Sequence, residues 1–98
     1  MAHCRGVSFW VQQPCGPYRI DAVAQSNRTQ LAIEIDGREF HHMNKHQIAA
    51  DHRRERHLLR AGYVVIRFTA GEAISNPTRC WRDVFAVLNA RRALERTA

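Results

Sequence analysis

The stretch Leu31–His42, LAIEIDGREFHH, constrains the fold of this chain more than any other feature. Apolar side chains at every second position alternate with Glu34 and Asp36, the period-two pattern of a β-strand. A strand with this pattern buries its apolar face and presents the two carboxylates on the other. Gly37 ends the strand.

A second strand is predicted just upstream, over Tyr18–Ala24 (YRIDAVA). The polar segment Gln25–Gln30 (QSNRTQ) between the two strands has the composition of a hairpin loop. Pairing its two end residues across a four-residue loop places Asp21 directly opposite Glu34. Like charges in that relation repel. We therefore expect a cation between them, because Mg²⁺ is held by one or two carboxylates plus substrate phosphates.

The length, net charge and cysteine content of the chain indicate how many domains it forms and what kind of partner it binds. The 98 residues, 45% hydrophobic, predict a single domain over 1–98 with a core from about 7 to 90. A net charge of +6 favours a polyanionic partner, either a nucleic acid or an acidic membrane surface. Three widely spaced cysteines without a signal-peptide pattern favour reduced thiols and a cytoplasmic location. No apolar run reaches the roughly 18 residues of a membrane span, so no membrane insertion is expected.

The remaining elements complete an α/β sandwich. Val7–Gln13 alternates as a strand, and the apolar run Tyr63–Thr69 predicts an interior strand covered on both faces. A helix is predicted over Lys45–Arg60 with Asn44 as its N-cap, and a last helix over Asn76–Arg96. The expected order is β-β-β-α-β-α, a mixed sheet with helices packed on it. Three aromatic residues are assigned to the core: Trp10, Trp81 and Phe85.

The order and spacing of these motifs resemble the PD-(D/E)XK nuclease superfamily, over about residues 13–88. Asp21 matches its first acidic residue. Glu34 and Asp36 match its E-x-K element, with aspartate where lysine is usual. The closest resemblance is to small Vsr-like (very-short-patch-repair-like) endonucleases, which commonly carry E-x-D-G followed by histidine, here His41 or His42.

Two further motifs of this group follow. Asp51 and Arg54 match a D-x-x-R on the next helix, and Arg67 matches the arginine of the strand after it. The helix that commonly precedes the first strand in these relatives has no counterpart, since only Met1–Gly6 stand before that strand. We therefore expect a partner subunit or larger complex to supply missing elements, or a homodimer to form for double-strand cutting.

The resemblance implies a restriction-endonuclease-like core and a metal-dependent endonuclease acting on DNA, in repair, restriction or mobile-element processes. Asp21, Glu34 and Asp36 would hold Mg²⁺, with Mn²⁺ as a substitute. His41 would act as general base or acid in place of the missing lysine. Arginine binds phosphate oxygens through a bidentate fork. The residues expected to contact the nucleic acid are Arg54, Arg67, His42 and Gln47.

Other interpretations stay open at this point. His41, His42 and His46 offer an alternative transition-metal site. The carboxylates are also compatible with the solvated face of a half-exposed sheet, and Arg67 with an ion pair to Asp51 or Glu34. A catalytically silent nucleic-acid-binding or scaffold module that retains the fold is the main alternative function. A basic subunit that binds an acidic protein is a third.

Overall fold

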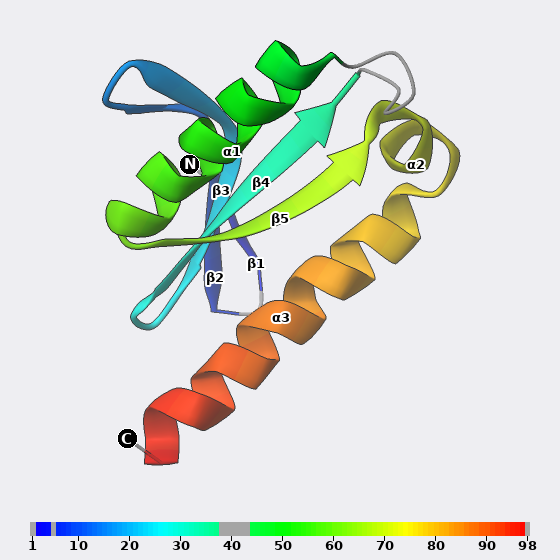
Figure 1. The fold of residues 1–98 in the computed structure, drawn as a ribbon. Helices are drawn as coiled ribbons and strands as arrows, with labels where there is room; N and C mark the ends of the chain where they lie inside the picture. The colour runs from blue at the N-terminus through cyan, green and yellow to red at the C-terminus, as the bar shows by residue number, and fades with distance from the viewer. Residues whose placement is uncertain (1, 5, 38–43, 98) are drawn as a thin grey trace.

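The computed structural model describes residues 2–4, 6–37 and 44–97. A five-stranded mixed sheet in the order β1-β2-β3-β4-β5 forms the centre of the molecule (Figure 1). The first four strands pair antiparallel, and β5 pairs parallel to β4 after the crossover helix α1. The strands are β1 (Ala2–Cys4), β2 (Val7–Cys15), β3 (Tyr18–Ser26), β4 (Thr29–Asp36) and β5 (Tyr63–Thr69). The helices are α1 (Lys45–Arg60), α2 (Ala70–Ser75) and α3 (Pro77–Thr97).

The sheet is covered by α1 on one face and by α3 on the other (Figure 1). Alternation along β4 divides its side chains between the two faces, so Leu31 and Ile33 point toward α3 while Ala32 points toward α1. The buried residues on the α3 side are Val7, Ala24, Leu31, Ile33, Phe68, Val84 and Leu88. Those on the α1 side are Ile20, Val23, Ala32 and Leu58. The architecture is therefore α/β, the predicted mixed sheet with helices packed on it.

The predicted helix Lys45–Arg60 is confirmed with both of its ends. Asn44 caps it in a full capping box, because its side chain accepts from the Gln47 N–H while the Gln47 side chain accepts from the Asn44 N–H, both at 2.9 Å. This helix covers the face of β4 that carries Glu34, so that side chain is buried with 6% of its surface exposed. The expectation that this face presents both carboxylates openly is wrong for Glu34.

The register of the β3–β4 hairpin is the predicted one, but its loop is shorter. Gln25 pairs with Gln30, and Ser26 also pairs with Thr29, which leaves a two-residue turn instead of four. Asn27 in that turn has φ 53°, the positive value that two-residue hairpins require. The predicted loop was too long because the polar residues Ser26 and Thr29 pair with each other and extend both strands.

Three other predictions need correction. The run Tyr63–Thr69 is the edge strand of the described sheet, and its apolar composition reflects helices covering both faces. The described N-terminal residues form β1, and α2 precedes the last helix, so the observed order is β-β-β-β-α-β-α-α. Trp81 was assigned to the core but lies at its rim, where it packs edge-on against Phe9 and is 47% exposed. Phe85 is partly buried against the core, as expected.

None of the described helices is long and apolar enough to cross a membrane.

The tip of the β2–β3 hairpin folds over onto α1. Gly16 turns the chain with φ +58°, and the Tyr18 ring meets the His57 ring edge-on at 5.2 Å. A Cβ added at Gly16 would lie 2.6 Å from His57 Nε2. The hairpin tip and α1 therefore approach each other as closely as the absence of a side chain at position 16 allows.

Gly16→Ala is expected to lower the free energy of unfolding by about 2 kcal/mol, since it adds a steric overlap to a left-handed backbone conformation. Gly62→Ala is the matched control, because Gly62 has φ +98° but nothing within 4 Å of the added Cβ. The control should lose only about 1 kcal/mol. Urea unfolding curves of both variants measure the difference, and equal losses would contradict the close contact.

Candidate active site

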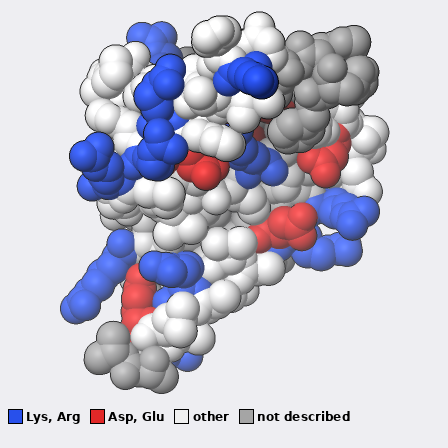
Figure 2. Space-filling model, viewed as in Figure 1, with Lys and Arg blue, Asp and Glu red and all other residues white. Residues whose placement is uncertain are grey.

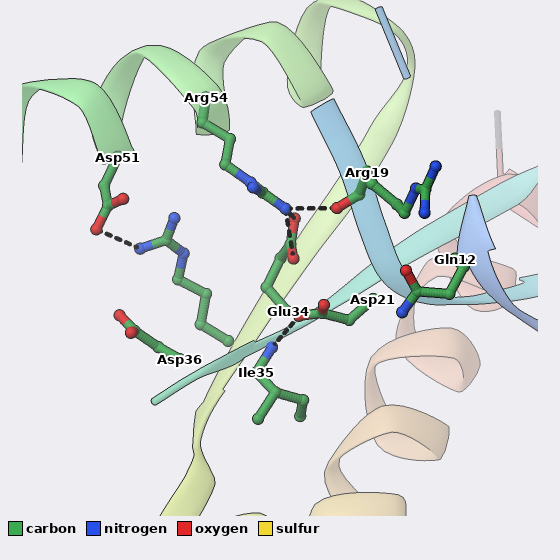
Figure 3. A pocket seen from close by; sticks show the side chains of 9 residues that line it. Gln12, Arg19, Asp21, Glu34, Ile35, Asp36, Asp51 and Arg54 are labelled. Carbon is green, nitrogen blue, oxygen red and sulfur yellow. Dashed lines mark hydrogen bonds and ion pairs between the residues drawn. The ribbon is translucent and has the colours of Figure 1, made fainter. Parts of the chain in front are cut away.

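A pocket of about 260 Å³ opens where β4 ends, between the β2–β3 hairpin and α1 (Figure 3). Its position follows from the topology, because the carboxyl ends of β4 and β5 meet at this edge of the sheet and α1 crosses above it. Its polar lining comes from β2, β3, β4, β5 and α1. The lining residues are Gln12, Arg19, Asp21, Glu34, Ile35, Asp36, Asp51, Arg54 and Arg67.

Glu34 and Arg54 form an ion pair at the buried end of the pocket. Arg54 Nη2 lies 3.0 Å from both Glu34 carboxylate oxygens, and its Nε lies 3.3 Å from Oε1. The same Nη2 donates to the Arg19 carbonyl oxygen at 2.7 Å, and the guanidinium lies 5.5 Å from the centre of the Tyr18 ring. One side chain of α1 thereby contacts both β3 and β4, which fixes the helix over the pocket.

The pKa of Glu34 is raised above its usual value. Burial is the largest cause, because it disfavours the charged form. The hydrogen bonds and the positive charge of Arg54 lower the pKa, and the neighbouring Asp21 carboxylate raises it. Glu34 is therefore a carboxylate that one cation already compensates and that still experiences repulsion from a second carboxylate.

Asp21 lies beside Glu34, as the predicted register requires. The β3–β4 ladder ends at the pair Ala22–Ile33, one pair before Asp21 and Glu34. Beyond that point Asp21 Oδ2 accepts a hydrogen bond from the Ile35 backbone N–H at 2.8 Å. A side-chain carboxylate thus replaces the backbone acceptor that the next ladder bond would use, and the two strands separate at the pocket.

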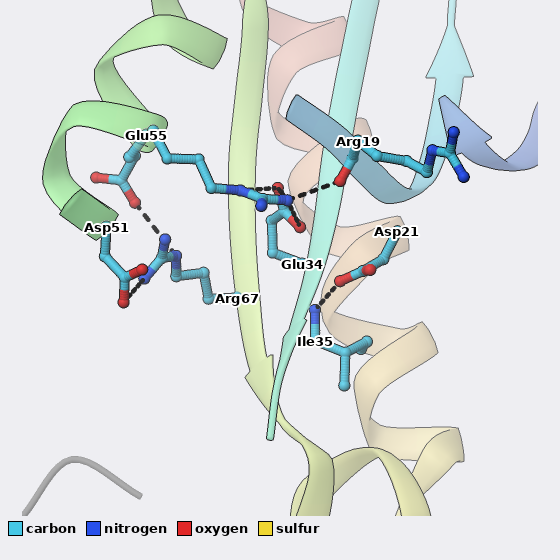
Figure 4. A network of polar contacts seen from close by, with 8 residues as sticks. Arg19, Asp21, Glu34, Ile35, Asp51, Glu55 and Arg67 are labelled. Atoms are coloured by element: carbon cyan, nitrogen blue, oxygen red, sulfur yellow. Dashed lines mark hydrogen bonds and ion pairs between the residues drawn. The ribbon is translucent and has the colours of Figure 1, made fainter. Parts of the chain in front are cut away.

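Arg67 enters the pocket from β5, where it is the register partner of Glu34. Its Nη1 lies 4.0 Å from Asp51 Oδ2 and its Nε lies 3.6 Å from Glu55 Oε1, so two carboxylates of α1 hold it (Figure 4). The Nε atom is buried and has no hydrogen-bond partner among the described residues. The ion pair between Arg67 and Asp51 is one of the two alternatives that the sequence left open, and Glu34 pairs with Arg54 instead.

The donor set fits a hard cation in part. Asp21, Glu34 and Asp36 all line the pocket. Among the residues that the structure describes, no three His, Cys, Asp or Glu side chains are close enough together to hold a metal ion. Mg²⁺ needs only one or two carboxylates when waters and substrate oxygens complete its coordination. The Asp21–Glu34 pair, in which two carboxylates repel each other, has the chemistry of such a site.

Three further residues were predicted for the site: Gln47, His41 and His42. Gln47 belongs to the capping box of α1 and is not among the residues lining the pocket. His41 and His42 lie outside the described residues. The nucleic-acid-binding role of Gln47 and the roles of both histidines stay predictions. His46 lies exposed in the first turn of α1.

Sequence reasoning missed Gln12 and Arg19. Arg19 contributes its backbone carbonyl to Arg54, which no side-chain motif signals. The position of Gln12 could have been predicted from the sequence. A turn at Gly16-Pro17 pairs Cys15 with Tyr18, and the same register places Gln12 opposite Asp21.

Basic side chains lie on α1 beside this site, and others lie on α3 on the opposite face of the sheet. Figure 2 shows Lys and Arg on the face that carries α1, β5 and α3, with carboxylates interspersed among them. Such a surface attracts polyanions through a sequence-independent, salt-sensitive interaction. It does not by itself distinguish one polyanion from another.

One comparison with known proteins gives a match. The family model REase_MTES_1575, which describes a restriction-endonuclease-like family, matches residues 3–88, most of the chain. The match includes every residue that lines the pocket. No curated protein and no solved structure matches this sequence.

Removing Arg54 tests the ion pair. Arg54→Ala leaves a buried carboxylate without its cation and is expected to lower the free energy of unfolding by about 3 kcal/mol at neutral pH. Arg53→Ala removes the same charge from the exposed neighbouring position and should change stability by no more than about 0.5 kcal/mol. Urea unfolding measures both losses, and equal losses would show that the pair contributes no stability.

The loss in Arg54→Ala should shrink as the pH falls from about 7 to about 5. A carboxyl group whose pKa folding raises destabilises the fold above that pKa, and this penalty disappears below the unfolded pKa. Without Arg54, neither its hydrogen bonds nor its positive charge lowers the pKa of Glu34. The stability lost by keeping Glu34 charged therefore grows, and protonation of Glu34 at lower pH restores it. Unfolding curves of wild type and variant across this range would contradict the argument if the difference were constant.

Proposed function

Because the chain belongs to the REase_MTES_1575 family, a restriction-endonuclease-like family of the PD-(D/E)XK superfamily, we propose that it is a metal-dependent endonuclease that hydrolyses phosphodiester bonds in DNA. Within the superfamily we place it with the Vsr-like enzymes. The E-x-D-G run at Glu34–Gly37 and the D-x-x-R at Asp51–Arg54 support this placement.

The observation that carries the proposal is the pair of carboxylates, Asp21 and Glu34, in a pocket that also holds arginines. Two neighbouring strands bring like charges together, and the Asp21 carboxylate adds a smaller increase to the pKa of Glu34 beside the larger increase that burial causes. A structural role alone gives no reason to keep this repulsion. A divalent cation between the two carboxylates would relieve it and could also bind a phosphate oxygen, an arrangement that supports phosphodiester hydrolysis.

Asp21 and Glu34 would hold Mg²⁺, with Asp36 and the Ile35 carbonyl as further oxygen donors from the lining. When bound, the ion supplies Lewis-acid stabilisation of the phosphate charge and lowers the pKa of a water molecule. The arrangement follows from the chain itself, because β3 and β4 separate at this point and leave the carboxylates facing the pocket.

The two arginines have different roles in this proposal. Arg54 donates to both oxygens of Glu34 and orients that carboxylate, which makes it a positioning residue. Within the described part of the chain, the buried Nε of Arg67 has no hydrogen-bond partner, and the guanidinium lies 4.0 Å from Asp51 and 3.6 Å from Glu55. These long contacts leave Arg67 better suited to bind the scissile phosphate. His41 remains the proposed proton-transfer group.

A second candidate is a catalytically silent DNA-binding module with the same fold. Asp36 stands where the superfamily usually has lysine, and Glu34 is already compensated by Arg54. Both features are compatible with a site that binds a polyanion without cutting it.

Conversion of supercoiled plasmid to nicked and linear forms, with Mg²⁺, with Mn²⁺ and with chelator, tests the proposal. Wild type should cleave with either ion and not with chelator. Asp21→Asn and Glu34→Gln should each lower the rate by about 100-fold or more, since each removes a carboxylate that would hold the metal. DNA binding of both variants should equal or exceed that of wild type, because a negative charge is lost.

Asp83→Asn is the control, because Asp83 is an exposed carboxylate on α3 outside this pocket. It removes the same charge and should cleave like wild type. A folded wild-type protein that binds DNA in a salt-sensitive manner but cleaves with neither ion would favour the silent module. Cleavage that persists in Glu34→Gln would place the chemistry outside this pocket.

A further inference from the structure

Gln12 has a backbone conformation that its residue type disfavours. Among the described residues, two that are not glycine have positive φ: Asn27, with 53°, and Gln12, with 57°. Asn27 lies in a hairpin turn, where asparagine adopts this conformation readily. Gln12 lies in the middle of β2, where a left-handed residue with a Cβ costs free energy. Such residues concentrate at functional sites, where the surrounding structure holds them in place.

The unusual conformation interrupts the sheet. The β2–β3 ladder includes Val11–Ala22 and Gln13–Ile20 but omits the pair between them, Gln12–Asp21. Trp10 and Cys15 pack against the same core cluster although they are five residues apart. In a regular strand, residues separated by an odd number point to opposite faces, so the alternation of β2 is interrupted between them. The break therefore turns the hairpin tip toward α1 and leaves position 12 facing the pocket.

The side chain of Gln12 is exposed and lines the pocket on the side of Asp21 (Figure 3). A bend alone does not require glutamine here. Glycine adopts positive φ without a steric cost and would form the same bend more easily. The presence of a long amide side chain at a strained position thus points to a use for the amide.

The charges around Gln12 indicate what that use is. Four carboxylates and three guanidinium groups line the pocket: Asp21, Glu34, Asp36, Asp51, Arg19, Arg54 and Arg67. Among the described residues that line the pocket, Gln12 is the one whose side chain is polar and uncharged. An amide N–H can donate to a phosphate oxygen without adding a charge that would compete with a cation for the carboxylates.

We propose that Gln12 is a substrate-binding residue, whose side-chain N–H donates to a non-bridging oxygen of the DNA phosphate beside Asp21. This inference rests on the proposed nuclease function and extends it to the side of the pocket that β2 forms. Gln12 would bind the phosphate from β2, opposite Arg67 on β5.

Steady-state cleavage of a short duplex by Gln12→Gly and Gln12→Glu tests this role. Gln12→Gly should unfold at an equal or higher urea concentration than wild type, because the strain is relieved, while its KM rises about tenfold from the lost hydrogen bond. Gln12→Glu should raise KM further, since its carboxylate repels phosphate. In Gln12→Gly, which adds no charge, the Mg²⁺ concentration at half-maximal rate should stay that of wild type.

Gln13→Glu is the matched control, because it introduces the same charge one residue away. The Gln13 side chain accepts from Trp10 Nε1 at 2.8 Å, a bond that glutamate can also accept, and it lies outside the lining of this pocket. Kinetics of Gln12→Gly identical to wild type would overturn the proposal and leave Gln12 a bend residue. A changed Mg²⁺ dependence at constant KM would also overturn it, because the amide oxygen would then be a cation ligand.

If the wild-type protein does not cleave DNA, the nuclease proposal fails independently of the role of Gln12. Equilibrium binding to the same duplex then decides the role of Gln12. Weaker binding by Gln12→Glu than by Gln13→Glu would support the phosphate contact, and equal binding would overturn it.

Discussion

The buried ion pair between Glu34 and Arg54 is the interaction on which the arrangement of this molecule depends. A carboxylate that is 6% exposed cannot stay charged without a cation or several hydrogen-bond donors. Arg54 provides both, and it also donates to the Arg19 carbonyl. One guanidinium group therefore links α1 to β3 and β4, so the position of the crossover helix and the shape of the pocket are determined together.

A buried ion pair of this kind is a poor means of stabilising a small domain. An apolar pair of similar volume would often be as stable, because burying two charges costs about as much as their attraction returns. Asp21 adds a second carboxylate beside the first and raises the pKa of Glu34 further. The charges at this position are thus better explained by what the pocket binds than by what holds the sheet together.

The parts of the fold that depend on neighbouring residues were predictable from sequence. Asn44 and the uninterrupted run after it defined α1 to the residue, and Gln25 opposite Gln30 gave the register that brings Asp21 to Glu34. Parts that depend on distant packing were not. Alternation in β4 does not reveal that α1 lies over Glu34, and an apolar run such as Tyr63–Thr69 does not distinguish an interior strand from an edge strand covered on both faces.

The limit was similar at the site. Strand pairing implies that Gln12, Asp21 and Glu34 lie across neighbouring strands, but it also implies that all three continue the ladder. In the structure the ladder omits Gln12–Asp21 and stops before Asp21–Glu34. These three residues line the pocket because the sheet does not pair there. Regular pairing at these positions would strengthen the sheet, so the ladder is interrupted at the residues to which we assign substrate and metal binding.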